Sequence, residues 1–274
     1  MLKKLGVSAS GYYDWKNRKP SARQQKKEAI KEVIREIYYS NYSIYGAPKI
    51  TRILRNKGYK ISERTVTRYM QEMGIRAIYV RPYTVTTISK DFTSKLKNTL
   101  SRQFSPEEPN ATWVTDITYI PTDEGFLYLS CVMDLYSRRI LAWELGKTLE
   151  TKYVVAAINK AVKATGCRPK VIHTDRGVQY TSDAYYEATE DIEKSYSRPG
   201  NPWDNACIES FHALLKREWL NRFHIKDYED AHTLIFEYID TFYNTVRIHS
   251  HCGYTSPYLY ERLYQINNRG RLIA

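Results

Sequence analysis

The sequence predicts an α/β protein in which a mixed five-stranded sheet is flanked by helices and preceded by a small α-helical, helix-turn-helix-like domain. Three observations support this prediction. Apolar residues recur at helical spacing over residues 21–74, and β-branched and aromatic residues dominate three segments between residues 112 and 145. Beyond residue 150, helical and strand patterns alternate. A chain of 274 residues can bury a core in one large domain with a smaller companion.

Residues 1–79 are predicted to form a basic helical region. Ser21 and Gln24 have the spacing of a capping box, and apolar residues then fall on one face of the following helix. Two shorter helices are expected, one opening at Pro48 and one capped by Ser62, and each stops at a glycine.

The two shorter helices, joined by a tight turn, resemble a helix-turn-helix, a motif whose second helix enters the major groove of DNA. The outward face of the second helix would offer Arg64 and Arg68 to the DNA. A plain helical hairpin with solvated arginines explains the same pattern equally well. The two interpretations differ in whether these arginines contact DNA.

Basic residues are concentrated near the N-terminus. Residues 1–100 contain 22 Lys and Arg against 7 Asp and Glu, whereas residues 101–274 contain 20 against 23. This asymmetry indicates a polyanion partner, and we favour nucleic acid over an ordinary solvated surface. Residues 80–110 are rich in Thr, Ser, Lys and Pro and have little periodicity. We therefore expect a linker there, followed by a second domain over residues 111–274.

The second domain begins with three predicted strands joined by short turns, which form an antiparallel meander. These strands cover residues 112–120, 126–134 and 139–145. The predicted elements that follow are a helix at 151–165, a strand at 170–173, a helix from 182, a strand at 193–197, and helices at 202–222 and 227–245. The order β-β-β-α-β-α-β-α is an RNase H-like layout.

Three carboxylates occur where this layout would bring them together. Asp116 interrupts the first strand, Asp175 follows the fourth strand, and Glu209 lies in the helix after the fifth. The first and fourth strands are neighbours in such a sheet, so their acids can converge and the helix can supply the third. Each acid alone is better explained as an edge-strand charge, a turn residue or a solvated helix residue. Their joint placement favours a single site.

Carboxylate oxygens are the ligands that Mg²⁺ and Mn²⁺ prefer. Two such ions can activate a water or a 3′-hydroxyl for in-line phosphoryl displacement, and they offset the repulsion among the acids. Asn205, His212 and Lys216 share the helical face of Glu209, so Lys216 can reach a phosphate beside the metals. The alternative for Lys216 is a solvated lysine. The pattern predicts a two-metal site for phosphoryl transfer.

Other classes of protein are disfavoured. The four cysteines lie far apart without a CxxC pair, which argues against a structural zinc site and a disulfide framework. No apolar stretch approaches the length of a membrane span, and the N-terminal segment lacks the apolar core of a secretory signal. We expect a cytoplasmic protein with no membrane partner.

Six segments, in the same order and over nearly the whole chain, resemble the DDE transposases of the IS-three family of insertion sequences. The resemblance is to the product of the family's second reading frame. The segments are LGVSASGYYDW, YGAPKI with the helix pair after it, WVTDITYIPT, VIHTDRGVQYTSDAY, SRPGNPWDNACIESFHALLKRE and YNTVRIHSHCGYTSPYLYE. That family belongs with retroviral integrases to the RNase H-like superfamily, which agrees with the predicted layout.

The resemblance implies that Asp116, Asp175 and Glu209 form the catalytic triad and bind two Mg²⁺ ions, with Mn²⁺ as a substitute. It further suggests four DNA contacts around the triad, which are Arg176, Gln179, Asn205 and Lys216. The chain departs from the family pattern in two places. Between Asp175 and Glu209 lie 33 residues, slightly fewer than is usual in the family, and Cys252 stands where the family commonly has Leu.

The resemblance also implies a reaction and partners. The expected activity is DNA 3′-end cleavage and strand transfer by direct phosphoryl displacement, without a covalent protein intermediate. Expected partners are element ends, target DNA and the first-reading-frame product, possibly as a fusion, with a homo-oligomer on DNA that is associated with the nucleoid. The alternatives are an RNase H-like nuclease that cuts without joining and an inactive DNA-binding remnant or regulator of transposition.

Overall fold

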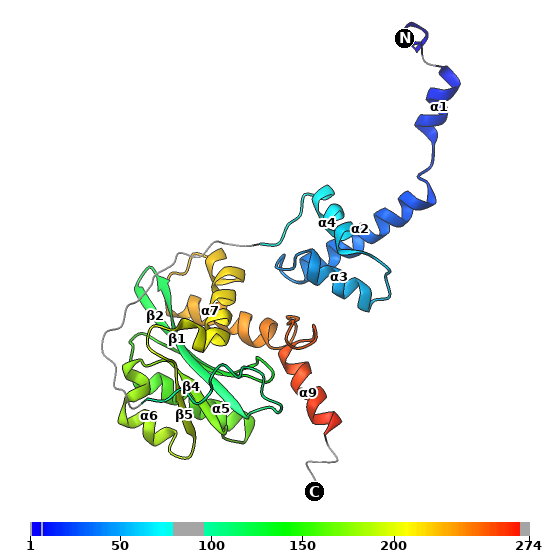
Figure 1. The fold of residues 1–274 in the computed structure, drawn as a ribbon. Helices are drawn as coiled ribbons and strands as arrows, with labels where there is room; N and C mark the ends of the chain where they lie inside the picture. The colour runs from blue at the N-terminus through cyan, green and yellow to red at the C-terminus, as the bar shows by residue number, and fades with distance from the viewer. Residues whose placement is uncertain (1, 7, 79–95, 269–274) are drawn as a thin grey trace. The chain divides into compact units, whose positions relative to one another are not determined.

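The computed structural model describes residues 2–6, 8–78 and 96–268, and the chain divides after Ile78 into two compact units (Figure 1). The first unit is helical. Its α-helices are α1 (Ala9–Asn17), α2 (Ala22–Ser40), α3 (Ala47–Asn56) and α4 (Glu63–Glu72), after a short 3₁₀ turn, η1 (Leu2–Leu5). The three later helices correspond to the three predicted ones, whereas α1 was not predicted.

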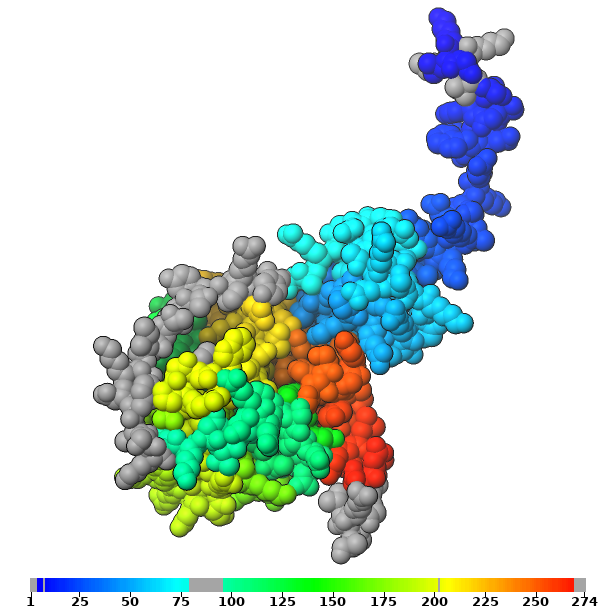
Figure 2. All heavy atoms as spheres, in the orientation of Figure 1, coloured from blue at the N-terminus to red at the C-terminus, as the bar shows by residue number. Residues whose placement is uncertain are grey.

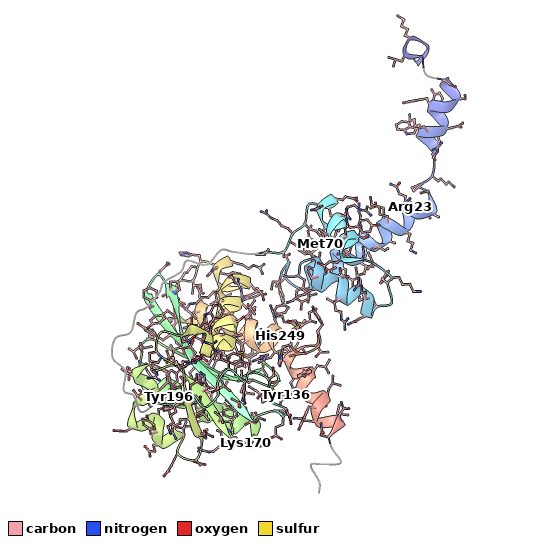
Figure 3. The ribbon with its side chains drawn as sticks, viewed as in Figure 1. Arg23, Met70, Tyr136, Lys170, Tyr196 and His249 are labelled. Atoms are coloured by element: carbon pink, nitrogen blue, oxygen red, sulfur yellow. The ribbon has the colours of Figure 1, made fainter. Side chains whose placement is uncertain are left out.

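Helices α2, α3 and α4 pack around a small apolar core. Ile34, Ile50, Leu54 and Val66 are fully buried, and Met70 lies among the three helices (Figure 3). Spacings of three and four residues bring these side chains to one face of each helix. A short helix alone is marginal in water, so this shared core is what stabilises the unit.

Serine caps begin two of these helices as the sequence predicts. The Ser21 hydroxyl accepts a hydrogen bond from the backbone N–H of Gln24, and the Ser62 hydroxyl accepts one from Thr65. The reciprocal half of the capping box is absent from the hydrogen bonds described at this helix end, where the amide of Gln25 instead donates to the Pro20 carbonyl. The Ser62 cap therefore fixes the residue at which helix α4 starts. The arginines of this helix are exposed.

The second unit is built on a five-stranded sheet. Its strands are β1 (Thr112–Thr122), β2 (Gly125–Asp134), β3 (Ile140–Gly146), β4 (Val171–Thr174) and β5 (Glu193–Tyr196). They lie in the order β3-β2-β1-β4-β5, with β1, β2 and β3 antiparallel and with β4 and β5 parallel to β1. This is the predicted RNase H-like mixed sheet, and the predicted fold class is confirmed.

Alternation along β1 assigns its side chains to two layers. Trp113 and Ile117 join the core beneath α5 (Thr151–Thr165). Val154 and Ile158 of α5 belong to the same core. Residues at even positions of β1 lie on the opposite face, towards α7 (Ala206–Glu218), which packs against this strand. The central strand therefore has helices on both faces, and its even positions face the helix that carries Glu209.

Further helices complete the second unit. They are η2 (Val178–Thr181), α6 (Asp183–Ala188), η3 (Pro202–Asn205), η4 (Leu220–Arg222), α8 (Tyr228–Phe236), the π-helix η5 (Glu237–Tyr243) and α9 (Pro257–Asn267). The long helix predicted over residues 202–222 is a regular α-helix only in its middle, because 3₁₀ turns form at both ends. The predicted last helix is α8 continued by η5, and α9 was not predicted.

Residues 96–110, which the sequence assigns to the linker, contact the second unit. Leu100 is buried, and its N–H donates to the Ser195 hydroxyl at 2.9 Å. The N–H of Tyr196 donates to the Lys97 carbonyl at 2.9 Å, so the segment continues the hydrogen bonding beyond β5. In Figure 2, these residues belong to the blue-green part of the surface of the second unit. Residues 80–95 of the predicted linker lie outside the described residues.

None of the described helices combines the length and the apolar character needed to cross a bilayer.

Candidate active site

The sheet register places Asp116 and Asp175 at the same level. In the parallel pair of β1 and β4, Val114 lies opposite His173. Asp116 comes two residues after Val114, and Asp175 comes two residues after His173. Neighbouring strands are roughly 4.8 Å apart, so both acids lie side by side at the end of the ladder. The convergence expected from the sequence therefore follows from strand register.

Helix α7 brings Glu209 to the same place. Ile208, Phe211 and Leu215 of α7 are buried in the core. Glu209 and the likewise buried His212, three residues apart, lie on one face of the helix. The Nδ1 atom of His212 lies 3.4 Å from the Oδ2 atom of Asp116. This contact joins the helix to the central strand directly at the candidate site.

The three carboxylates affect one another electrostatically. Desolvation and then the negative charges of Asp116 and Asp175 raise the pKa of Glu209 to about 7. Desolvation and the charge of Asp116 raise the pKa of Asp175 as well, even though its side chain is exposed at the mouth of the site. The site therefore concentrates negative charge that a cation would relieve.

Carboxylate oxygens suit Mg²⁺ or Mn²⁺, and the raised pKa values reflect desolvation of the acids and then the repulsion between them. Three residues close in sequence to Asp175 or Glu209 carry buried polar atoms. Thr174 Oγ1, Asn205 Oδ1 and His212 Nε2 have no hydrogen-bond partner among the described residues. Within those residues, however, no three His, Cys, Asp or Glu side chains are already arranged to hold one ion. In its chemistry, the set of oxygen donors fits a divalent cation.

Gly177 approaches Asp175 closely. Its N–H donates to Asp175 Oδ1 at 2.9 Å, and a Cβ at this position would lie 3.1 Å from that oxygen and from Gln179 Oε1. A glycine therefore allows the backbone to orient the carboxylate. This role is visible in the structure, whereas the sequence shows only a turn.

The loop after Asp175 uses the other predicted residues for internal contacts. The guanidinium of Arg176 donates to the carbonyls of Ser197 and Leu96. The amide of Gln179, a buried side chain, donates to the Leu149 carbonyl at 3.1 Å. Both residues stabilise the loop in this structure.

Asp204 anchors the loop before α7. Its carboxylate is fully buried and accepts hydrogen bonds from the side chains of Arg198, Arg102 and Asn98 at 2.7–3.0 Å. The hydrogen bonds from Arg198 and then Arg102 outweigh desolvation and lower the pKa of Asp204. The sequence offers Arg198 as a nearby partner, but nothing in it pairs Asp204 with residues about a hundred positions earlier. This anchor fixes the start of the helix that carries Glu209.

The remaining predicted residues fall into two groups. Lys216 is partly buried on α7. Desolvation lowers its pKa, and the charge of the nearby Asp116 opposes this shift only in part. Asn205 is buried at the start of α7. The structure therefore brings Lys216 to the acids, whereas Arg64 and Arg68 are exposed on α4 of the first unit.

Comparison with known proteins identifies the family. The integrase core domain family matches residues 106–202 and 190–257, and the HTH-like domain family matches residues 25–83. The transposase for insertion sequence element IS904 of Lactococcus lactis is 36% identical over 249 residues, which is 90% of this chain and 98% of that protein. The chain belongs to the IS-three family of insertion-sequence transposases. Its activity is thereby placed in DNA transposition.

Two further proteins are similar to this IS-three family member. The transposase InsF for insertion sequence IS3A of Escherichia coli is 34% identical over 266 residues, covering 95% of this chain and 92% of that protein. Among solved structures, the HTLV-2 integrase catalytic core domain in complex with magnesium has a TM-score of 0.45 and 16% identity. That match covers 57% of this chain and 98% of the integrase chain.

Proposed function

We propose that this transposase performs metal-dependent cleavage of insertion-element ends and joins those ends to target DNA, with Asp116, Asp175 and Glu209 as the metal ligands. One observation carries the proposal. The β1–β4 register and α7 gather three carboxylates from distant parts of the chain, and desolvation, followed by the charges of the neighbouring acids, raises the pKa of Asp175 and Glu209. Enzymes use such clusters of perturbed acids at functional sites.

The chemistry needs hard oxygen ligands and a positive charge. When bound, two Mg²⁺ ions, or Mn²⁺ in their place, would activate the attacking water or 3′-hydroxyl and stabilise the departing oxygen of an in-line displacement. The protein holds the ligands for this chemistry. His212 contacts Asp116, the N–H of Gly177 holds Asp175, and the buried Asp204 fixes the loop before Glu209.

DNA contacts are proposed on both units. Lys216 extends from α7 on the face that carries Glu209 and can pair with a phosphate next to the acids. Arg176, Gln179 and Asn205 stay predicted contacts around it. The hydrogen bonds that Arg176 and Gln179 make in this structure would have to be exchanged or shared. Arg64 and Arg68 would contact DNA from the HTH-like domain.

Partners are proposed from the same reaction. Joining two element ends in one event requires two active sites, so we expect a dimer or a larger homo-oligomer on DNA. We also propose that the first-reading-frame product contributes recognition of the terminal repeats, either as a separate chain or fused to this one.

The direct test is Mg²⁺-dependent strand transfer of a labelled, precut element end into plasmid DNA. Asp116→Asn, Asp175→Asn and Glu209→Gln should each retain less than about 1% of wild-type joining, since loss of a residue that only hydrogen-bonds to a metal ligand already costs roughly 10- to 100-fold. The matched control is Glu190→Gln, an exposed acid on the same unit, which should join normally. The first-frame product is added in a parallel series.

Three outcomes separate the candidates. Loss of joining in all three variants with retained DNA binding supports the transposase mechanism. Cleavage without joining in the wild type favours the nuclease. DNA binding without any chemistry, with or without the first-frame product, favours the inactive remnant.

A further inference from the structure

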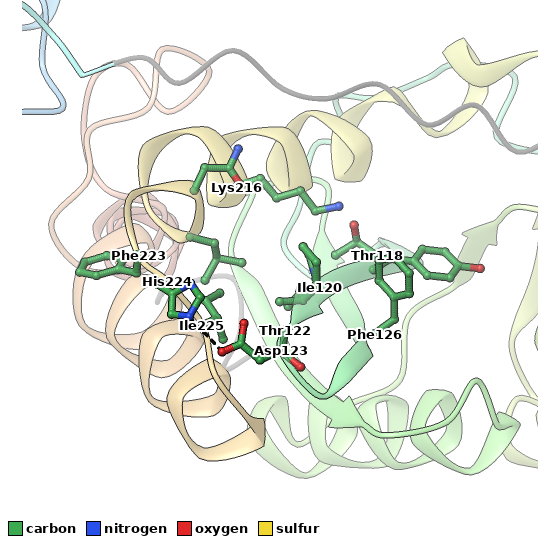
Figure 4. A pocket seen from close by; sticks show the side chains of 13 residues that line it. Thr118, Ile120, Thr122, Asp123, Phe126, Lys216, Phe223, His224 and Ile225 are labelled. Atoms are coloured by element: carbon green, nitrogen blue, oxygen red, sulfur yellow. Dashed lines mark hydrogen bonds and ion pairs between the residues drawn. The ribbon is translucent and has the colours of Figure 1, made fainter.

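An open, largely apolar pocket of about 860 Å³ lies beside the candidate active site (Figure 4). It is formed by the β1–β2 hairpin, the end of α7 and the segment that follows η4. Its lining includes Thr118, Tyr119, Ile120, Phe126, Lys216 and Phe223. A pocket of this size is in the range that proteins use for small organic ligands.

Three aromatic side chains that line the pocket are exposed to solvent. Phe126 is 60% exposed, and Tyr119 and Phe223 are each 43% exposed. Tyr119 contacts Phe126 edge-on, with ring centroids 6.3 Å apart. Exposed rings grouped in one hollow are available to stack on a planar partner.

The pocket shares strand β1 and helix α7 with the candidate site. Asp116, Thr118 and Ile120 alternate along β1 and therefore share the face beneath α7, and the last two line the pocket. Figure 4 shows Lys216 extending from α7 towards Thr118. Lys216 thus lines the pocket from the helix that carries Glu209 and is close enough to Asp116 to be affected by its charge, so a phosphate bound by its ammonium would place the attached nucleotide at the pocket.

The far side of the pocket is polar. The His224 Nε2 atom lies 2.9 Å from the Asp123 carboxylate, and both residues line the pocket. An imidazole and a carboxylate together can donate and accept hydrogen bonds at the edge of a heterocycle. The pocket thus offers rings for a planar face, polar groups for its edge and a cation for an attached phosphate.

We propose that this pocket receives one unstacked nucleobase of the DNA, next to the phosphate that reacts. The inference rests on the proposed function, because it takes DNA as the substrate of the neighbouring carboxylates. A base is the occupant that matches all three features, since it is planar, has hydrogen-bonding edges and is attached to an anion. Unstacking one base would expose the reacting strand to the acids.

The test measures the affinity of the full chain for a labelled duplex that carries a precut element end, without divalent metal. A single abasic site is placed in turn at each position around the reactive phosphate. The proteins compared are the wild type, Phe126→Ala, Phe126→Trp and Phe236→Ala. Phe236 is the matched control because it is 49% exposed and lies on α8, away from this pocket.

At one position, removal of the base should weaken wild-type binding about 5- to 150-fold, the range for stacking of one base on an aromatic ring. Phe126→Ala should bind the intact duplex more weakly than the wild type by a similar factor. On the duplex with that abasic site, its affinity should be almost the same as that of the wild type, since both changes remove the same contact. Phe126→Trp should bind as the wild type, and Phe236→Ala should respond to the abasic site as fully as the wild type. Phe223→Ala should repeat the Phe126→Ala pattern.

The inference is overturned if Phe126→Ala leaves affinity unchanged, or if its loss adds fully to that of every abasic site. Strand transfer by the wild type on the intact duplex is scored in the same series with Mg²⁺. If the wild type transfers strands but the effects of Phe126→Ala and the abasic sites are independent, only the proposed base pocket is contradicted. If the wild type shows no DNA chemistry at all, the proposed function itself is contradicted.

Discussion

Asp116 shows how a single residue is fitted to its role. An acid within the central strand is unfavourable for packing, but the strand position keeps its carboxylate rigid and next to the end of β4. His212 and the mutual repulsion of the acids define its surroundings. The supporting residues Gly177 and Asp204 show the same principle, since each orients a neighbouring acid or loop through hydrogen bonds.

At the residue scale, Asp204→Asn should lower the free energy of unfolding by roughly 2 kcal/mol, because hydrogen bonds to charged partners are lost from a buried group. The folded-state pKa of Asp204 is lowered, so its stabilisation is fully present above the unfolded value of about 4, begins to decline as the pH falls below that value and is lost only as the pH falls through the lowered folded-state pKa. Urea denaturation at pH 7 and pH 3 measures this. The gap between the two proteins should be smaller at pH 3 than at pH 7 but should not close, because the folded-state carboxyl is still ionised at pH 3.

Asp191→Asn is the control for that prediction, because Asp191 pairs with Arg168 at the surface with 69% of its side chain exposed. It should change stability by less than about 0.5 kcal/mol. A gap for Asp204→Asn that stays constant with pH would contradict the role given to the charge.

Metal binding should depend on pH through Glu209. Its pKa of about 7 means that the carboxyl must lose a proton before it can bind Mg²⁺. Affinity should therefore rise about 10-fold between pH 6 and pH 8, with proton release on binding. Calorimetric titration with Mg²⁺ and Mn²⁺ in buffers of different ionisation enthalpy measures both quantities.

In Glu209→Gln the remaining affinity should vary less with pH, whereas Glu190→Gln should behave as the wild type. Equal affinity at pH 6 and pH 8 in the wild type would show that Glu209 is not a ligand.

At the scale of elements, the fold is held together by contacts between helices and strand edges. The clearest is between the end of η5 and β3. The N–H of Ile140 donates to Asn244 Oδ1 at 3.0 Å, and Asn244 Nδ2 donates back to the Ile140 carbonyl at 2.9 Å. One side chain thus satisfies both backbone groups of a buried residue, 104 positions away in the sequence.

Asn244→Ala should destabilise the protein by about 3 kcal/mol, because it leaves two buried backbone groups without partners. Thermal and urea denaturation of the full chain measure this. Asn159→Ala, at an exposed position of α5, should have an effect below about 0.5 kcal/mol. Equal stability of the two variants would mean that the β3 edge finds other partners.

At the scale of the whole molecule, charge is divided between the two units. Residues 1–78 contain 18 Lys and Arg against 6 Asp and Glu, whereas residues 79–274 contain 24 of each. Electrostatic attraction to DNA is therefore expected mainly from the helical unit, and metal chemistry from the other unit. We therefore expect one part of the chain to bind DNA while the other carries the acids.

Replacement of Arg64 and Arg68 by Ala should make the dependence of log Kd on log salt shallower by about 2, since each phosphate contact contributes roughly 0.9. Titration of the full chain with duplex DNA at several salt concentrations measures the slope. The control is the double variant Lys152→Ala and Lys163→Ala, two exposed cations on α5, which should keep the wild-type slope. Equal slopes for both variants would favour the plain helical hairpin over a DNA-binding one.

Much of this architecture was predictable because it is local. The strand pattern of residues 112–145, the caps at Ser21 and Ser62, and the acids within or beside regular elements are all encoded by nearby residues. Helix ends were less predictable, as in residues 202–222, where 3₁₀ turns flank α7. The choice between α and 3₁₀ geometry there depends on contacts such as that of Asp204, which the local sequence does not contain.

By itself, the sequence determined the order of the elements, the concentration of basic charge near the N-terminus and the three acids, because periodicity and composition act over a few residues. Only the tertiary structure decided that Asp116 and Asp175 lie side by side, that Arg102 reaches Asp204 and that aromatic rings surround a pocket next to Lys216. These features join residues tens to about a hundred positions apart. Strand register and helix packing set such distances, and no local pattern encodes them.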